Sequence, residues 1–590
     1  MSLDCFLAVL LCLLCARPGV AIPRVIDTKR SITYLGLEHN DIELFLGIPY
    51  GQDTGGAHRF RPPRAVSPSF GRTIDATTYG PACPQQLGII AGSGLPVMIY
   101  IHGGGFWGGS NEEPVFAPDG LVRESVRNGM PVLHVAMNYR LGLFGFAQSE
   151  ALRSEGSENA GLRDQRLALK WVQNNIKYFG GDPGRVTIFE TSSGGLSVGM
   201  HMMAYGGSKP APFQRAICQS QALEPGITRS FTIDAMQRVV EYAGCGTAGL
   251  HAPTTVSCLR GLDMETLLNA SIATYRGDIV SNIGDIWLPS VDGDFLPEAP
   301  STLIRQGRFA IMPAAENIAA AMFGWCENDV TLFTDIHIKS ANDTEAFLTS
   351  YVSGVLPEKI KELLTLYPVS EFTAAATQTL SAEFFRAARI FRDIVMVCPT
   401  LWYAERLAQA ATAGRGAECA GRQGARRVET APASVYLYDW NQTILEPLLE
   451  GWTGRFGWGS VPTSEIGYIF ANFSSYDDVV IDSRGDLVPP GATDYALQVR
   501  GSRSWSTFAS TGSPWMREKH TFKGFKPAFP EVNSGMNRRI SIFVAGGPHQ
   551  GLTVVDGHNI RAKSTALKEQ KLRERCMFLN SPEMIEQVGY

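Results

Sequence analysis

Four short segments of the chain are apolar along nearly their whole length and contain several β-branched residues. They span residues 96–101, 132–137, 186–189 and 216–219. Continuous apolar runs of this length are typical of strands that are buried on both faces of a parallel sheet. Between the second and third runs, apolar residues recur at helical spacing, at Leu167, Trp171, Val172 and Ile176. Strand and helix therefore alternate, which predicts an α/β fold with a mostly parallel, doubly wound sheet and helices on both faces.

The rest of the chain is expected to belong to the same single domain, which would cover residues 22–590. Residues 233–410 are richer in amphipathic helical patterns, such as those at 358–366 and 382–391, and they predict a helical cap. Residues 409–433 contain alanine, glycine and arginine with almost no large apolar side chain. This composition predicts a long exposed insertion.

The first residues of the chain include an apolar run from Phe6 to Cys15, followed by the small residues Gly19-Val20-Ala21. This pattern predicts a secretory signal peptide over residues 1–21, and therefore a secreted, extracellular protein. A run of about ten apolar residues is too short to cross a bilayer, which takes about 20, and no later segment of the sequence approaches that length. We therefore expect no membrane span.

The charged residues argue against several classes of partner. They make up 18% of the chain, the net charge is −5, and lysine and arginine form no sustained run, so we expect no nucleic-acid partner. No pair of cysteines has the spacing of a zinc site, and we expect no metal and no cofactor. The predicted partner is a small molecule, and the oligomeric state is left open.

Export would place the chain in an oxidising environment, where disulfides form. Eight cysteines remain after removal of the signal peptide: Cys83, Cys218, Cys245, Cys258, Cys326, Cys398, Cys419 and Cys576. Four Asn-x-Ser/Thr sequons without proline at the middle position predict surface glycans. They begin at Asn269, Asn342, Asn441 and Asn472.

A serine stands between a predicted strand and a predicted helix. The strand ends near Phe189, Ser192 follows, and an apolar helix begins near Leu196. In a nucleophile elbow, a sharp turn at this position lifts a serine above the sheet. The alternative is an ordinary helix N-cap, because Thr191, Ser192 and Ser193 are all residue types that cap helices.

A run of glycines from Gly103 to Gly105 follows the predicted strand at 96–101. Glycines let backbone amides approach a developing oxyanion without interference from side chains. The amides of Gly104, Gly105 and Ser193 are therefore candidates for an oxyanion hole. Glycine runs also occur in plain turns, but a glycine run after a buried strand, combined with a downstream serine elbow, is more specific than either motif alone.

Further motifs extend a resemblance over most of the mature chain. They are Phe45-Leu46-Gly47-Ile48-Pro49-Tyr50, Arg59-Phe60-Arg61-Pro62-Pro63, Asn138-Tyr139-Arg140-Leu141-Gly142, Asn159 to Gln165, and Gly180-Gly181-Asp182-Pro183. Together with His102 to Phe106 they resemble the type-B carboxylesterase/lipase family, which has the α/β-hydrolase fold, and Ser192 to Met200 is similar to its fungal branch. The resemblance implies hydrolysis of a carboxylic ester through an acyl-enzyme, with a triad in the order serine, acid, histidine.

The resemblance also implies roles for individual residues. Ser192 would be the nucleophile, and the family's acid falls at Asp329, where it would orient and stabilise an imidazolium. Two disulfides are implied, Cys245–Cys258 and Cys398–Cys576, and the second would tie the C-terminal segment to the cap. Each would stabilise the fold by about 2–4 kcal/mol.

The triad histidine is missing from the position where the resemblance places it. Family members carry it just before a segment similar to Thr463 to Phe470, and this chain has Pro462 there. Proline cannot accept the serine proton, and by analogy with subtilisin the loss of the histidine costs about a millionfold in turnover. His520 and His549 lie outside the motif, and we expect both to be surface residues.

Three further departures from the family pattern predict structural damage. Glu190 replaces the first glycine of the elbow motif and is expected to clash or to relax the strained turn. Between Cys83 and Val97 the family has a longer stretch with a strand and a disulfide partner, so a lost strand and poor secretion are expected. An alanine-rich insertion covers 314–322.

Three interpretations of the chain remain open. It is a working esterase, a catalytically silent homologue that binds a ligand in the same pocket, or a sequence that departs from its gene at the two segments of altered length. All three share the fold, and the residues do not reveal which ester is bound.

Overall fold

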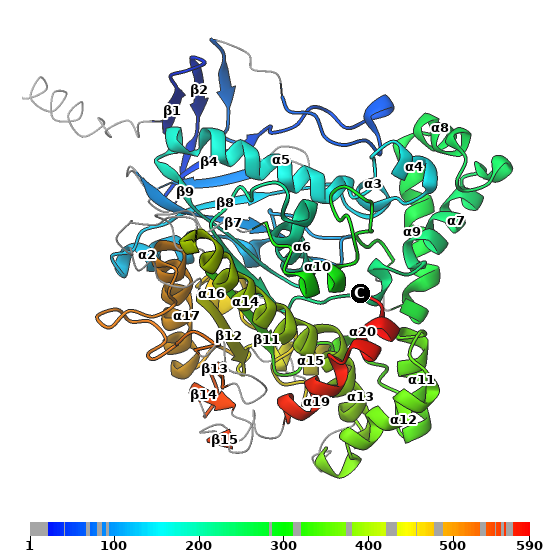
Figure 1. The fold of residues 1–590 in the computed structure, drawn as a ribbon. Helices are drawn as coiled ribbons and strands as arrows, with labels where there is room; N and C mark the ends of the chain where they lie inside the picture. The colour runs from blue at the N-terminus through cyan, green and yellow to red at the C-terminus, as the bar shows by residue number, and fades with distance from the viewer. Residues whose placement is uncertain are drawn as a thin grey trace, which may run out of the picture.

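The structure is a computed structural model and describes most of the chain after the expected signal peptide, which lies outside the described residues. The described ranges are 22–39, 42–66, 71–78, 85–89, 94–282, 286–310, 320–372, 380–420, 434–455, 457–476, 488–530, 539–548, 550–555, 560–561 and 570–590. Within these ranges the chain forms one large sheet with helices packed around it (Figure 1).

The central sheet has twelve strands in the described ranges, in the order β15-β14-β13-β12-β11-β10-β9-β7-β8-β6-β4-β3. Their bounds are β3 (Leu37–His39), β4 (Ile42–Ile48), β6 (Gln85–Ile89), β7 (Leu95–Ile101), β8 (Leu133–Met137), β9 (Gly181–Thr191), β10 (Arg215–Gln219), β11 (Ala320–Cys326), β12 (Ser434–Trp440), β13 (Ile540–Ala545), β14 (Gly551–Val555) and β15 (Ile560–Arg561). The run from β8 to β13 is parallel throughout, and the strands at both ends of the sheet are antiparallel. The prediction of a mostly parallel sheet is therefore confirmed, and the four apolar runs of the sequence are β7, β8, β9 and β10.

The predicted loss of a strand before Val97 is wrong. Strand β6 lies between β4 and β8 and pairs antiparallel with both, with Leu87 opposite Phe45 on one side and opposite Val135 on the other. Five residues are enough to form the strand between β4 and β8, so the short segment still completes the hydrogen-bonded ladder of the sheet. The expectation of poor secretion loses its basis, and Cys83 lies outside the described residues.

Helices cover both faces of the sheet and bury two separate apolar cores. On one face lie α5 (Ala160–Asn175), α6 (Ser193–Met203) and α14 (Cys398–Ala420), which cross in front of the strands in Figure 1. Leu169 of α5 and Leu196 of α6 belong to this core. On the other face lie α2 (Asp119–Arg127), α16 (Ile466–Ile469) and α17 (Ala492–Thr511), and Trp505 of α17 is fully buried there. The doubly wound arrangement is therefore confirmed.

A group of helices stands along one side of the molecule, away from the sheet (Figure 1). It contains α7 (Phe231–Tyr242), α8 (Pro253–Gly261), α9 (Met264–Asn282), α11 (Ala341–Tyr351), α12 (Pro357–Leu366) and α13 (Ala382–Arg392). These helices form the predicted cap, but the cap is not continuous in sequence, because β11 returns to the sheet between α10 and α11. Residues 320–322 of the alanine-rich insertion are the first residues of β11, and 311–319 lie outside the described residues.

The remaining elements are short. They are a separate three-stranded sheet of β1 (Arg24–Asp27), β2 (Ile32–Leu35) and β5 (Thr73–Asp75), and the helices α3 (Gly142–Phe146), α4 (Glu150–Ser154), α10 (Pro300–Gln306), α15 (Glu446–Thr453), α19 (Leu572–Leu579) and α20 (Pro582–Val588). No helix in the described ranges is both long and apolar enough to cross a membrane.

The first half of the predicted exposed insertion at 409–433 is helical, because helix α14 continues to Ala420. Alanine has the highest helix propensity of all residues, so an alanine-rich segment that follows a packed helix extends it readily. Residues 421–433 lie outside the described residues.

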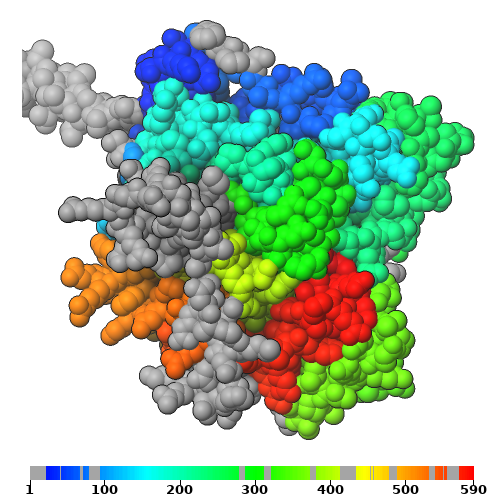
Figure 2. Space-filling model, in the orientation of Figure 1, coloured from blue at the N-terminus to red at the C-terminus, as the bar shows by residue number. Residues whose placement is uncertain are grey.

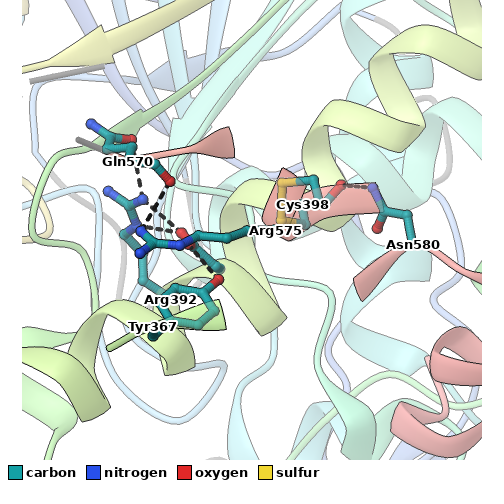
Figure 3. The surroundings of a disulfide bond; sticks show 8 residues. Tyr367, Arg392, Cys398, Gln570, Arg575 and Asn580 are labelled. Atoms are coloured by element: carbon teal, nitrogen blue, oxygen red, sulfur yellow. Dashed lines mark hydrogen bonds and ion pairs between the residues drawn. A yellow bond between two sulfur atoms is a disulfide. The ribbon is translucent and has the colours of Figure 1, made fainter. Parts of the chain in front are cut away.

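Two disulfides are present, and both are the pairs that the resemblance implied. Cys245 bonds to Cys258 between α7 and α8, and Cys398 at the start of α14 bonds to Cys576 of α19. Figure 3 shows the second bond, beside which the Asn580 amide donates to the Cys398 carbonyl oxygen at 2.8 Å. In Figure 2 the C-terminal segment lies against the surface of the cap.

A buried polar network adjoins this disulfide (Figure 3). The Arg392 guanidinium forms an ion pair with Asp393 at 2.6 Å and donates to the Gln570 side-chain oxygen at 3.1 Å. The Arg575 guanidinium lies 3.9 Å from the centre of the Tyr367 ring and donates to the Gln570 carbonyl at 3.0 Å. The disulfide and this network together hold the C-terminal helices against the cap.

Three of the four sequons agree with a surface glycan, and one does not. Asn269 and Asn342 are exposed and Asn441 is half-buried, so glycosylation at these positions remains a prediction. Asn472 is only 8% exposed, and its Nδ2 donates to the Val115 carbonyl at 2.7 Å and to the Pro114 carbonyl at 3.2 Å. The predicted glycan at Asn472 is therefore wrong, because the atom that would carry it is already bonded inside the fold.

We expect Cys576→Ser to lower the free energy of unfolding by about 2–4 kcal/mol, because the unfolded chain would no longer be closed into a long loop. Denaturant unfolding under non-reducing conditions measures the change. The double variant Cys398→Ser/Cys576→Ser is the control for the unpaired thiol and should lose a similar amount. Identical midpoints for the wild type and both variants would contradict this account.

Candidate active site

The turn at Ser192 has the geometry of a nucleophile elbow. Strand β9 ends at Thr191, α6 begins at Ser193, and Ser192 between them has φ 58° and ψ −132°. This is a strained conformation for a residue with a side chain, of the kind that clusters at functional sites. The N-cap alternative does not hold, because the Ser192 side chain makes no capping hydrogen bond.

Two glycines at the start of α6 allow this helix to pack closely against the sheet. A Cβ atom on Gly194 would lie 2.2 Å from the Ile101 carbonyl oxygen, and one on Gly195 would lie 2.4 Å from the Gln219 carbonyl oxygen. Real Cβ atoms do not approach backbone oxygens so closely, so only glycine fits at either position. The Ser192 amide also donates to the Gln219 carbonyl at 3.1 Å, which fixes the turn to β10.

Glu190 does not distort the elbow, contrary to the expectation from the sequence. Its side chain occupies the space beside Gly194, where an added Cβ would lie 2.4 Å from the Glu190 Cγ atom. Its Oε1 accepts a hydrogen bond from the Gly103 amide at 3.0 Å, and the residue is fully buried. Burial raises the pKa of Glu190 well above its usual range. The Glu190 side chain therefore fits beside Gly194, which has no side chain of its own. Its hydrogen bond to Gly103 holds the glycine loop to the elbow.

The glycine loop directly follows β7 and faces the elbow. Gly104 and Gly105 have φ values of 103° and 61°, a region that favours glycine. The Phe106 amide donates to the Ser193 hydroxyl oxygen at 3.3 Å, and the Tyr139 hydroxyl donates to the His102 carbonyl at 2.8 Å. These contacts tie both ends of the loop to its surroundings.

Three backbone amides remain without an acceptor beside Ser192. Among the described residues, no group accepts a hydrogen bond from the amides of Gly104, Gly105 or Ser193. All three residues line the same cavity as Ser192. This is the composition of an anion-binding site made from main-chain donors.

The cavity over Ser192 has a volume of about 630 Å³ and a largely apolar wall. Tyr275 of α9 and Phe391 of α13 bring the cap helices into this wall, and α15 adds Leu448. The polar residues besides serine and threonine are Glu113, Glu190, Glu224, Tyr275 and Tyr476. A cavity of this size with few polar groups suits a small organic ligand.

Pro462 lines the cavity together with Ser192, at the position where the family's histidine was expected. No histidine within the described ranges lines this cavity. His102 is 1% exposed, with Nδ1 3.0 Å from the Gly103 carbonyl, and burial lowers its pKa to about 4. His520 is exposed in the segment after α17, and His549 lies outside the described residues.

Asp329 lies behind the cavity wall, just after β11, and does not line the cavity. It is 1% exposed, and its two oxygens accept hydrogen bonds from the Cys326 amide at 2.8 Å and the Ser220 hydroxyl at 3.2 Å. Burial, with a contribution from the nearby Glu465, raises the pKa of Asp329 to about 8. The side chain is therefore mostly a neutral acid at neutral pH, because burial disfavours its charged form and no imidazole among the described residues contacts it.

Comparison with known proteins identifies the family of this chain. Residues 33–94 and 89–542 match the family described as the carboxylesterase family. This chain belongs to the carboxylesterase family. Family membership supports its assignment as a carboxylic ester hydrolase.

Two relatives of this carboxylesterase-family chain differ in what their names say about activity. A secreted lipase of Arthroderma benhamiae is 47% identical over 98% of both chains. An inactive carboxylesterase-like protein of Byssochlamys spectabilis is 30% identical over 83% of this chain and 84% of its own. The crystal structure of EstA from Aspergillus niger has the same fold, with a TM-score of 0.70 and 21% identity over 97% of this chain and 99% of its own.

Two buried carboxyl groups of this carboxylesterase-family chain were not singled out from the sequence. Glu465 is fully buried; its Oε1 accepts from the Gln219 amide group at 3.1 Å, and its Oε2 lies 3.1 Å from the Cys326 thiol. Glu224 lines the cavity a few residues after β10. Glu224 could have been found from the sequence, because it follows the carboxyl end of a predicted parallel strand. Ligands bind at these strand ends in open α/β sheets.

We expect Asp329 to make the free energy of unfolding fall as the pH rises from about 4 to about 8. The folded state keeps a proton on Asp329, whose pKa is raised from 3.8 to about 8, while the unfolded chain releases it. The contribution of this carboxyl to stability therefore decreases with pH across that window. Urea unfolding at a series of pH values measures the slope.

The variant Asp329→Asn should flatten this slope, because the amide does not titrate. Asp343→Asn is the matched control, since hydrogen bonds from the Lys339 and Ser340 amides lower the pKa of this exposed carboxyl and its titration lies below the window. An unchanged slope in Asp329→Asn would show that this carboxyl is ionised in the folded state.

Proposed function

We propose that this chain binds a small-molecule ester in the cavity over Ser192 and hydrolyses it only slowly. Ser192 is the nucleophile, and the amides of Gly104, Gly105 and Ser193 form the oxyanion hole. Asp329 is the acid of the family's triad, and Pro462 occupies the place of its base. The molecule thus combines an intact binding site with an incomplete catalytic one.

The geometry supports the first half of an acyl transfer. Attack of the Ser192 oxygen on a bound carbonyl places negative charge on the carbonyl oxygen, and amides without another acceptor stabilise that charge. The serine oxygen must also lose its proton, and the leaving alcohol must gain one. No described group in the cavity is an imidazole, so both proton transfers lack the base that the family uses and acylation is slow.

The observation that carries this proposal is the position of Pro462 in the wall of the Ser192 cavity. A proline has neither a proton acceptor nor a side-chain donor, whereas the elbow and the glycine loop keep their geometry. The inactive carboxylesterase-like relative supports the idea that members of this family persist without ester turnover. The secreted lipase relative supports an ester ligand, and with the N-terminal pattern it supports secretion.

We expect the purified protein to hydrolyse a small activated ester at a rate barely above background. Pro462→His should raise kcat by about a hundredfold or more, because a positioned general base contributes about 10²–10⁴-fold. Initial rates with a chromogenic ester measure both proteins.

Ser192→Ala in the Pro462→His background is the control and should abolish the gained activity. Wild-type turnover at ordinary esterase rates would refute the proposal of an incomplete site. A Pro462→His variant that folds but stays at background would refute the role given to position 462.

A further inference from the structure

The carboxyl group of Glu224 lies in an apolar part of the cavity wall. The residue is 8% exposed, and it shares the lining of the cavity with Ala222, Leu288, Phe391, Val395 and Met396. The Leu223 amide donates to the Val395 carbonyl at 2.8 Å, which holds the backbone of this segment against the π-helix Asp393–Val397 that follows α13. The carboxyl is therefore fixed in place and faces a space built for apolar groups.

Few interactions within the protein offset the cost of burying the Glu224 carboxyl. The only hydrogen-bond partner of this carboxyl group in the described part of the chain is the Tyr351 hydroxyl, which donates to Oε2. Burial raises the pKa of Glu224 to about 7, and no cationic side chain opposes this effect. A carboxylate has about four acceptor positions, so most of its acceptor capacity is unused.

Three other buried carboxyls near the site are placed differently. Both oxygens of Asp329 accept hydrogen bonds, both oxygens of Glu465 contact donors, and neither residue lines the cavity. Glu190 does line it, but its Oε1 accepts from the Gly103 amide and holds the glycine loop. The Glu224 carboxyl therefore offers open acceptor positions to a group that enters the cavity.

Tyr351 connects this carboxyl to a second cavity. That cavity has a volume of about 890 Å³ and is lined by Tyr351, Phe347 and His337. Tyr275, Leu332 and Phe333 line both cavities. The pair of Glu224 and Tyr351 therefore stands near the junction of the two spaces, where an extended ligand with one polar group can place that group.

We propose that Glu224 binds a hydrogen-bond donor, a hydroxyl or an ammonium group, carried on the otherwise apolar chain of the ester ligand. This inference rests on the proposed function, since it assumes that the Ser192 cavity holds an ester. It makes Glu224 a residue that determines specificity. The ligand is then an ester with a polar substituent remote from its carbonyl, and a plain fatty acyl ester is a poorer fit.

Equilibrium binding to the full-length protein tests this proposal, because slow turnover leaves the ligand intact. The probes are ethyl esters of ω-hydroxy and ω-amino fatty acids, and hexanoate esters of diols and amino alcohols. Each is compared with the unsubstituted ester of equal length across a series of lengths. The wild type should bind at least one donor-bearing probe about tenfold or more tightly than its plain partner, because a hydrogen bond to a charged group is worth about 1.5–3 kcal/mol.

In Glu224→Leu the order should reverse, with the plain ester bound more tightly than the donor-bearing one. A reversal cannot arise from a misfolded protein, which would lose both ligands. Glu113→Gln is the matched control, because Glu113 lines the same cavity and its Oε1 already accepts from the Ser110 amide at 3.0 Å; its preference should equal that of the wild type.

Two results would overturn the proposal. The first is tighter binding of plain esters by the wild type at every length. The second is an unchanged preference in Glu224→Leu. In both cases ester binding itself survives, and with it the proposed function. Failure of every ester to bind the wild type would instead overturn the proposed function and this inference together.

Discussion

The close approach of α6 to the sheet is the constraint on which the rest of the site depends. It exists because Gly194 and Gly195 carry no Cβ atoms that would collide with the Ile101 and Gln219 carbonyls. The short distance forces the chain to turn sharply at Ser192, and the turn places the serine beside the glycine loop after β7. The position of Ser192 beside the three open amides follows from this packing contact.

The interior beside this turn is unusually rich in carboxyl groups. Glu190, Asp329 and Glu465 are buried within the core that supports the elbow, and burial raises the pKa of each. In a complete triad a positive charge on the base would favour the ionised acid. In this chain burial favours the neutral form of each carboxyl, which can both donate and accept hydrogen bonds.

The sequence predicted those parts of the structure that depend on local pattern. The continuous apolar runs of β7 and β9 and the glycines around Ser192 indicated the parallel sheet and the elbow. Strand β6 was missed because Gln85 to Ile89 form no apolar run, and its pairing with β4 and β8 is a long-range contact. The fit of Glu190 depends on space beside Gly194, and the importance of Glu224 depends on cap helices that meet it only in three dimensions.

The backbone conformation of Ser192 lowers the stability of the fold while it keeps the geometry of the elbow. A left-handed φ of 58° on a serine costs about 1–3 kcal/mol compared with a relaxed turn. Glycine at this position would relieve the strain and would also remove the hydroxyl that lines the cavity. A chain selected for stability alone would discard this conformation, so its presence beside Pro462 shows that the elbow is kept although it lowers stability.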